Sequence, residues 1–324
     1  MKAFYIKSKN GGTVMERRDV PPPEPKRGEI VVRTRVASLN RGELLAAIGL
    51  HRVSAARPAG VDGAGEVHAV GVGVSGFRAG DRVMFRARGA FSEYVAVVVE
   101  QSVLIPGCLS WEQAGAVPAV FVTAYESIRQ FGRLRKGNWL LVAGASSGVG
   151  VACIQTAKYL GARVIGTSGS SEKLERLKSL GLDVGISSRG SDFAAQTLEV
   201  TRGKGVDVAV NLVGGTAFPG CLASLANQGR LAIVGYVDGV MKSEIDLEPV
   251  HGKRLHIFGV SNTHLTAAER ARAMRGFVRE FLPGLADGSI VPAVDRVFPF
   301  DDLPAAKAYI ESNTHVGKVV VTLS

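Results

Sequence analysis

Hydrophobic and polar positions near the middle of the chain predict a strand, a turn, a helix and a second strand. Trp139–Ala143 is an apolar run of strand length, and residues 163–167 form another. Between them lie residues 144–150, mostly Gly, Ala and Ser, and residues 151–160, which suit a helix ended by Gly161. In such a unit, small residues let the backbone approach a phosphate, and the N–H groups at the helix start bind the anion.

The first 120 residues follow a different pattern, in which short apolar strands are separated by turns and no long helix occurs. Residues 63–83 alternate apolar strand positions with glycine turns, and a proline-rich connector occupies residues 21–25. We therefore expect a small, closed or partly closed β-barrel. The expected strands are residues 2–6, 30–36, 65–70, 81–85 and 94–99.

Beyond residue 120 the pattern changes to alternating strands and helices, which predicts a doubly wound, mainly parallel sheet. A helix is expected over residues 171–180, where Leu174, Leu177 and Leu180 share one face and Gly181 follows the end. Further strands are expected at residues 206–213, 230–234 and 255–260.

The last sixty residues carry no nucleotide motif and are expected to pack back on the first domain. Apolar residues from Met274 to Leu285 fall at helical spacing, and Pro283 is expected to bend or end the regular turns. A short helix is expected over residues 305–310 and a final strand over residues 318–323.

Composition leads us to expect a soluble, cytosolic protein. The 324 residues are 46% hydrophobic, which supports two globular domains, and no apolar run is long enough for a membrane or a leader peptide. The net charge of +10 is spread along the chain and only 6% of residues are aromatic, so a phosphorylated cofactor is the expected anion and nucleic acid is not. Cys108, Cys153 and Cys221 have no disulfide or zinc spacing and are expected to be buried small residues.

Three motifs fit the turn at residues 144–150, and the turn alone does not choose among them. Ala145, Ser147 and Gly150 align with the dinucleotide fingerprint G-x-G-x-x-G. Gly144, Gly148 and Gly150 give the G-x-x-x-G-x-G spacing of short-chain dehydrogenases. Gly144, Ser146 and Gly148 satisfy G-x-S-x-G, the nucleophile elbow of a serine hydrolase.

Four segments elsewhere in the chain and at this turn, taken together, indicate a protein family. The segments GEVHAVGVGVSGFRAGDRV, VPAVFVTAYES, VAGASSGVG and HVGKVVVTL occur in this order. Together they resemble the zinc-free quinone oxidoreductase (zeta-crystallin-like) branch of the medium-chain dehydrogenase/reductase superfamily over essentially the whole chain. The resemblance implies an α/β protein with a GroES-like β-barrel catalytic domain at residues 1–120, completed by residues 266–324, and a Rossmann domain at residues 121–265. Short-chain dehydrogenases, by contrast, carry the turn at the N-terminus and a later Tyr-x-x-x-Lys, which here matches only residues 5–9.

The resemblance also implies that no catalytic zinc is bound. Zinc needs three or four Cys, His or carboxylate ligands with one position open for substrate. Where zinc-dependent relatives carry a Cys and a Gly-His-Glu, this chain has Asn40 and residues 60–62, which read Gly-Val-Asp. A later cysteine is missing near residues 119–122. The six histidines, His51 among them, form no H-x-x-x-H pair and are expected to be surface or structural residues.

NADPH is the expected cofactor. NAD selectivity usually rests on an Asp or Glu about twenty residues past the glycine turn. Residues 166–171 read GTSGSS and contain no acid, so the small side chains leave room for a 2′-phosphate that Lys173 or Arg189 would neutralise. The alternative is that Ser170 or Ser171 only caps the following helix and that Lys173 is a solvated surface residue.

The resemblance assigns site residues by position. Asn40 and Thr123 correspond to positions near the nicotinamide, and Leu45 replaces a tyrosine common in relatives, which makes that pocket more apolar. Relatives often have Asn-Tyr where this chain has Ser187 and Ser188. The positions implied to bind cofactor are Asn40, Thr123, Ser146, Ser147, Gly148, Val149, Gly169, Lys173, Ser188, Arg189, Gly214, Gly235, Tyr236 and Val260.

The implied reaction is hydride transfer from NADPH to a quinone or an α,β-unsaturated carbonyl, without metal and with Asn40 as the polar group closest to the chemistry. Asn40 is otherwise a structural turn residue. Alternatives are an enoyl reductase of the same fold and a non-catalytic NADPH-binding protein. A serine hydrolase using Ser146 with Asp246 and His251 or His315 has no use for the long β-rich first half. Family analogy suggests a homodimer or tetramer.

Overall fold

A computed structural model describes residues 1–324 except residues 10–11, 45–54 and 324, so Leu45 and His51 lie outside the described residues. The chain forms two compact units. Unit 1 comprises residues 1–120, 270–278 and 285–324, and unit 2 comprises residues 121–269 and 279–284. The domain boundaries expected from the sequence, at residues 120 and 265, stay a prediction.

Unit 1 is rich in strands, which form a three-stranded sheet of order β2-β1-β4 and a larger sheet of order β15-β16-β3-β5-β6-β8, with β7 also on β3. Its core consists of buried aromatic and aliphatic side chains such as Ile6, Phe85 and Phe91. The strands are β1 (Lys2–Lys9), β2 (Gly12–Asp19), β3 (Glu29–Ser38), β4 (Arg57–Pro58), β5 (Asp62–Val70), β6 (Arg82–Arg86), β7 (Tyr94–Val98), β8 (Ser102–Leu104), β15 (Val294–Pro299) and β16 (Lys318–Thr322). The helices that lie in unit 1 are α1 (Arg41–Leu44), α2 (Trp111–Gly115) and α11 (Leu303–Glu311), whereas α3 (Pro118–Ala124), α9 (Ala267–Glu280) and α10 (Leu282–Ala286) contribute to both units.

Strand β3 connects the two ends of the chain within unit 1. It pairs antiparallel with β5 along most of its length, with β7 through residues 29–33, and with β16 through residues 36–38. The pairing with β5 contains two register shifts, and the other edge of β3 pairs first with β7 and then with β16. The segment that ends the chain therefore lies beside a strand formed near its beginning.

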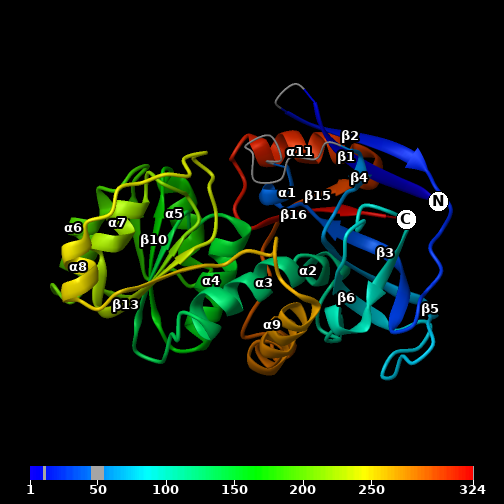
Figure 1. The fold of residues 1–324 in the computed structure, drawn as a ribbon, viewed down its shortest axis with the longest axis horizontal. Coiled ribbons are helices and arrows are strands. Elements are labelled where there is room, and N and C mark those ends of the chain that lie inside the picture. Colours follow the sequence, from blue (N-terminus) through cyan, green and yellow to red (C-terminus); the bar gives the residue numbers. More distant parts are fainter. Residues whose placement is uncertain (10–11, 45–54, 324) are drawn as a thin grey trace. The chain divides into compact units, whose positions relative to one another are not determined.

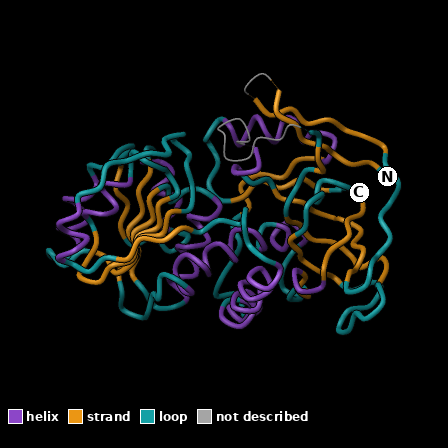
Figure 2. Tube along the Cα trace, in the orientation of Figure 1, coloured by secondary structure: helices purple, strands orange, loops and turns teal. Residues whose placement is uncertain are grey.

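Unit 2 is a six-stranded parallel sheet of order β11-β10-β9-β12-β13-β14, with helices on both of its faces (Figures 1 and 2). Its central strands are buried apolar runs, as expected for a sheet covered on both sides. The strands are β9 (Trp139–Ala143), β10 (Arg163–Ser168), β11 (Val184–Ser187), β12 (Val206–Asn211), β13 (Leu225–Ile233) and β14 (His256–Gly259). The helices are α4 (Gly148–Tyr159), α5 (Ser171–Lys178), α6 (Phe193–Val200), α7 (Phe218–Ala223) and α8 (Leu247–Gly252), preceded by the π-helix η3 (Tyr125–Gln130).

Most expected strands and helices are confirmed, with corrections at their ends. The helix expected from Val151 begins at Gly148, because Ser147 caps it there. The strand expected from residue 230 begins at Leu225. The helix expected from Met274 begins at Ala267 in a stretch of small and charged residues, and the turns are interrupted at Phe281 before α10, which contains Pro283.

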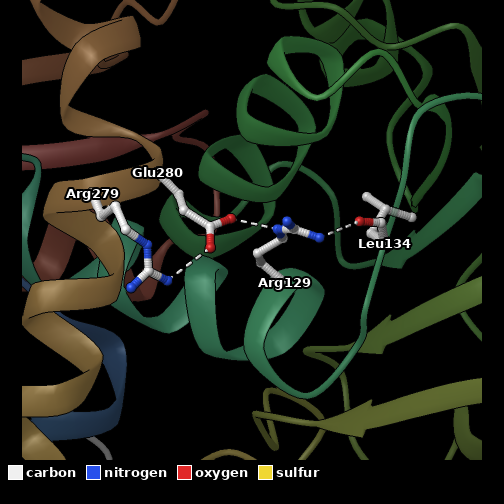
Figure 3. A network of polar contacts seen from close by, with 4 residues as sticks. All are labelled: Arg129, Leu134, Arg279 and Glu280. Atoms are coloured by element: carbon white, nitrogen blue, oxygen red, sulfur yellow. Dashed lines mark hydrogen bonds and ion pairs between the residues drawn. The ribbon is translucent and has the colours of Figure 1, made fainter.

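Charged side chains join η3 to the end of α9 within unit 2 (Figure 3). Arg279 donates from Nη2 to Oε1 of Glu280 over 3.0 Å, and Arg129 donates from Nε to the other carboxylate oxygen. Arg129 also donates from Nη1 to the carbonyl oxygen of Leu134, 3.3 Å away. The carboxylate of Glu280 thus holds two guanidinium groups from different helices.

The cysteines differ in burial. Cys153 and Cys221 are buried as expected, and burial raises the pKa of the Cys221 thiol to about 12. Cys108 is exposed, contrary to expectation, and its thiol donates to the carbonyl oxygen of Leu285 over 3.3 Å. In the part of the chain that the structure describes, no helix has the length and apolar character needed to cross a bilayer.

Candidate dinucleotide-binding site

The strand order of unit 2 creates a switch point at the carboxyl edge of its sheet. From β9 the chain moves outward to β10 and β11, and then returns to place β12 on the other side of β9. The paired ends Ala143 and Asn211 lie level with each other, and the N–H of Leu212 donates to the carbonyl of Ala143 over 3.1 Å. Ligands of open α/β sheets bind in the crevice outside such strand ends. The switch point is therefore the candidate site.

The turn after β9 is shaped for a close approach of its backbone to an anion. Gly144 has a positive φ of 84°, and a Cβ on Gly150 would lie 2.5 Å from the carbonyl oxygen of Ala145. The Ser147 hydroxyl donates to the Gly144 carbonyl over 2.9 Å and accepts from the Gly150 N–H over 3.1 Å. The first regular hydrogen bond of the helix runs from the Val151 N–H to the Ser147 carbonyl. The N–H groups just before it therefore have no carbonyl partner within the helix, as is usual at a helix start. Gly148 and Val149 carry these amides, and the helix dipole adds to their attraction for an anion.

The end of β10 combines an acid-free turn with basic residues. A Cβ on Gly169 would lie 2.7 Å from Cγ of Arg189, and Nη2 of Arg189 donates to the Gly169 carbonyl over 3.4 Å. The guanidinium group therefore lies across the glycine, which only a residue without a side chain permits. Ser170 caps α5 by accepting from the Lys173 N–H over 3.3 Å. Ser170 is thus confirmed as the cap of α5, and Lys173 lies on the first turn of that helix.

Ser188 lies at the end of β11, next to Ser168. Its N–H donates to the Ser168 carbonyl over 3.0 Å, and its hydroxyl is hydrogen-bonded to the carboxylate of Asp192. The hydroxyl also accepts from the Gly190 N–H over 3.3 Å. Asp192 thus lies beside Ser188, a residue that the family resemblance assigned to the adenosine-phosphate pocket, and no sequence pattern had indicated Asp192.

The loops after β12, β13 and β14 bring four more of the predicted residues to the carboxyl edge. Gly214 follows β12, and Gly235 and Tyr236 follow β13, where the Gly235 N–H donates to the Asn211 carbonyl over 3.3 Å. Val260 follows β14 and donates its N–H to the Ile233 carbonyl over 2.9 Å. The sheet therefore gathers along one edge the predicted residues 146–149, 169, 214, 235, 236 and 260.

Two predicted residues lie elsewhere in the fold. Thr123 is buried in α3, and its carbonyl accepts from the Ser127 hydroxyl over 2.7 Å. Asn40 belongs to unit 1 and follows β3. Its Oδ1 accepts from Nζ of Lys318 over 2.8 Å, and its Nδ2 donates to Oδ1 of Asp62 over 2.7 Å and to the Ser38 carbonyl over 3.4 Å.

The residues around Asn40 form a buried charged cluster that the sequence did not indicate. Asp62 also accepts from the Ser38 hydroxyl and the Ala119 N–H, and Lys318 also donates to the Leu39 carbonyl. Burial lowers the pKa of Lys318, against the attraction of Asp62 and Glu43. Burial also raises the pKa of Glu43 to about 7, although the Gly60 N–H donates to its Oε1, while its Oε2 is buried without a hydrogen bond.

Alternative chemistries find little support in the geometry. Among the described residues, no three His, Cys, Asp or Glu side chains gather as a metal site would require, and the side chain of Val61 offers no metal ligand. In the described chain, no hydrogen bond joins the Ser146 hydroxyl to a histidine. Asp246, the acid considered for a hydrolase triad, instead caps α8 by accepting from the Glu248 N–H over 3.0 Å.

Comparison with known proteins agrees with both units. A family model described as "Alcohol dehydrogenase GroES-like domain" matches residues 26–107, and one described as "Zinc-binding dehydrogenase" matches residues 148–278. Prostaglandin reductase-3 of Bos taurus is 31% identical over 327 residues, covering 95% of this chain and 84% of that protein.

Two further similarities extend the comparison. The Escherichia coli quinone oxidoreductase solved with NADPH superposes with a TM-score of 0.89 at 26% identity, with 100% of both chains covered. A highly reducing polyketide synthase of Alternaria alternata is 30% identical over 309 residues, which cover 94% of this chain. The chain spans only 12% of the length of that synthase.

The expected fold, a GroES-like barrel with a Rossmann domain, is thus confirmed. The chain belongs to the zinc-free, zeta-crystallin-like branch of the medium-chain dehydrogenase/reductase superfamily.

Proposed function

We propose that this protein uses NADPH to reduce quinones or α,β-unsaturated carbonyl compounds without a metal ion. The observation that carries the proposal is the carboxyl edge of the unit 2 sheet. There the start of α4, with its unpaired N–H groups, follows β9, and the neighbouring strand β10 ends in a turn that contains no acid and is covered by Arg189. The E. coli quinone oxidoreductase of the same fold, solved with NADPH, supports the choice of cofactor.

The residues at this edge fit the parts of the cofactor. The N–H groups of Gly148 and Val149 would hold the diphosphate at the start of α4. The lack of a side chain at Gly150 lets the turn pack closely against the helix that carries them. Arg189 and Lys173 would neutralise the 2′-phosphate. When bound, NADPH supplies the hydride.

Asn40 remains the proposed polar group of the substrate site. Lys318 and Asp62 fix the orientation of its carboxamide, because Oδ1 faces the ammonium group and Nδ2 faces the carboxylate. The 3.4 Å contact from Nδ2 to the Ser38 carbonyl is the weaker of its two donations. That second N–H is the one proposed to stabilise the negative charge that develops on a substrate oxygen.

Steady-state oxidation of NADPH and NADH tests the proposal. The acceptors are 9,10-phenanthrenequinone, 1,4-benzoquinone, a medium-chain enone and an enoyl thioester, each with and without chelator. We expect NADPH-dependent turnover that chelator does not change. Tight NADPH binding without turnover of any acceptor would instead favour a non-catalytic protein, and turnover of the thioester alone would favour an enoyl reductase.

Cofactor selectivity has its own variant. Arg189→Ala is expected to raise KM for NADPH about tenfold, because one charge-assisted hydrogen-bond partner of the 2′-phosphate is lost, and to leave KM for NADH unchanged. Lys178→Ala removes an exposed cation from the last turn of α5 and is the matched control. An equal rise in KM for both cofactors would contradict the assignment of Arg189.

The proposal is accompanied by expectations about the cellular compartment and the oligomeric state. The free thiol of exposed Cys108 suits a reducing compartment, which supports the cytoplasm as the site of action. A homodimer or tetramer stays an expectation from family analogy, and size-exclusion chromatography with light scattering tests it.

A further inference from the structure

Two side chains that no motif marked hold the loop that follows β12. Asn211, at the end of that strand and only 1% exposed, accepts with Oδ1 from the N–H groups of Val213 and Gly214, both over 3.0 Å. Its Nδ2 donates to the Gly214 carbonyl over 2.8 Å. One carboxamide therefore satisfies both the N–H and the C=O of Gly214.

Asp238, in the loop after β13, holds the same segment from the other side. Its Oδ2 accepts from the N–H and the hydroxyl of Thr216, over 2.9 and 2.6 Å, and its Oδ1 accepts from the Val240 N–H over 2.8 Å. Its own N–H donates to the Val213 carbonyl over 2.9 Å. The two loops are thus joined by side-chain and backbone bonds together.

The approach of the loops is close enough to require glycine. Gly214 has a φ of 130°, and a Cβ there would lie 2.0 Å from Oδ1 of Asp238. A Cβ on Gly215 would lie 2.6 Å from the carbonyl oxygen of Lys242. The hydrogen bonds of Asn211 and Asp238, which together we call the clamp, therefore define one backbone conformation for residues 212–216 beside the switch point.

The order of the strands says which part of the cofactor would meet this loop. With the diphosphate at the start of α4, the ribose that carries the 2′-phosphate lies toward the end of β10. Strand β12 is on the opposite side of β9, so the other half of the dinucleotide extends over it. On the basis of the proposed function, we infer that Asn211 and Asp238 are positioning residues that fix the loop beside the nicotinamide half of NADPH.

Substitution of Asn211 by aspartate tests the clamp with almost no change in size. Oδ1 can still accept from Val213 and Gly214, but the second carboxylate oxygen faces the Gly214 carbonyl instead of donating to it. Burial and this carbonyl both favour the protonated acid, whose O–H again donates to Gly214. The defect of Asn211→Asp is therefore expected at alkaline pH and is reversed at acidic pH.

The experiment compares wild type with Asn211→Asp at pH 8 and pH 6, using a quinone acceptor and NADPH deuterated at either face of C4. We expect kcat at pH 8 to fall between tenfold and a hundredfold, as small misplacement of reacting groups does. The Kd of NADPH should change less than about threefold, because the diphosphate and adenosine contacts remain. The defect should shrink at pH 6, and the preference for one face of C4 should weaken at pH 8.

Two further variants separate positioning from folding. Asp238→Asn, which replaces one acceptor oxygen, should lower kcat several-fold with little change in the Kd of NADPH. Asp207→Asn is the matched control, since Asp207 accepts the Trp139 N–H over 2.8 Å at the opposite edge of the same sheet, and it should leave kcat unchanged.

Three outcomes would overturn the inference. The first is an Asn211→Asp enzyme with kcat within twofold of wild type at both pH values, and the second is a parallel loss of NADPH affinity, kcat and Tm in that variant and in Asp207→Asn. A wild-type protein that oxidises no NADPH would refute the proposed function itself, and the inference with it.

Discussion

Replacing Glu43 by glutamine should remove most of the pH dependence of stability in unit 1 near neutrality. Burial raises the pKa of this carboxyl from 4.5 to about 7, the Gly60 N–H and the charges of Arg57 and Lys318 oppose that rise, and the charge of Asp62 adds to it. At pH values between 4.5 and about 7, Glu43 is therefore protonated in the folded state and ionised in the unfolded chain.

The sign and the size of the effect follow from linkage. Because the folded state binds more protons across this window, the free energy of unfolding falls as pH rises from 4.5 to about 7 and then levels off. At 1.36 kcal/mol for each step of one in pKa, the rise from 4.5 to about 7 corresponds to about 3 kcal/mol. Glutamine can keep the acceptor for the Gly60 N–H and cannot ionise. Glu43→Gln should thus be more stable than wild type at pH 8, by up to about 3 kcal/mol, and similar to it at pH 4.5.

Urea unfolding at several pH values between 4.5 and 8 measures this difference. Glu66→Gln is the control, because Glu66 is a partly exposed glutamate of the same unit that pairs with Arg35. Its difference from wild type should stay within about 1 kcal/mol throughout. Parallel curves for wild type and Glu43→Gln over the whole range would refute the reasoning, since they would mean that Glu43 is ionised to the same extent in both states.

Two other substitutions test contacts in unit 2. Ser147→Ala removes the cap of α4 and should cost about 1 kcal/mol in urea unfolding and weaken NADPH binding in calorimetry, whereas Ser146→Ala, next to it, should leave stability unchanged; equal effects of the two changes would argue against the cap. Glu280→Gln should cost about 1–2 kcal/mol at pH 7, because Arg129 and Arg279 lose their shared carboxylate. Burial alone would raise the pKa of Glu280, but hydrogen bonds and charges from the two arginines leave it below 4.5. The cost should therefore be full above pH 4.5 and should shrink as pH falls through the folded-state pKa of Glu280; a cost that does not change with pH would contradict the ion-pair explanation.

The sequence predicted best those elements whose pattern is local. Trp139–Ala143 is an apolar run between polar neighbours, and both of its ends are as expected. Strand β2 was not predicted because its residues, GTVMERRD, lack an apolar face. The first half of α9, AAERARA, was missed for a similar reason, since small and charged residues give little helical periodicity.

The same distinction separates the parts of the site. The turn after β9 could be predicted because the small residues that an anion needs are consecutive. The surroundings of Asn40 could not, since its partner Asp62 is 22 residues away and Lys318 is 278 residues away. Asn211 and Asp238 were missed because an amide and an acid are common after strands, and only the folded structure shows that both hold the loop after β12.

The pairing of β16 with β3 sets the order in which the two units can form during translation. Residues 36–38 leave the ribosome early, but their partners at residues 320–322 are made only after all of unit 2. Unit 2 can therefore complete its sheet while one edge of β3 still lacks its neighbour. A nascent chain stalled before residue 318 would present that open edge to chaperones and to other chains.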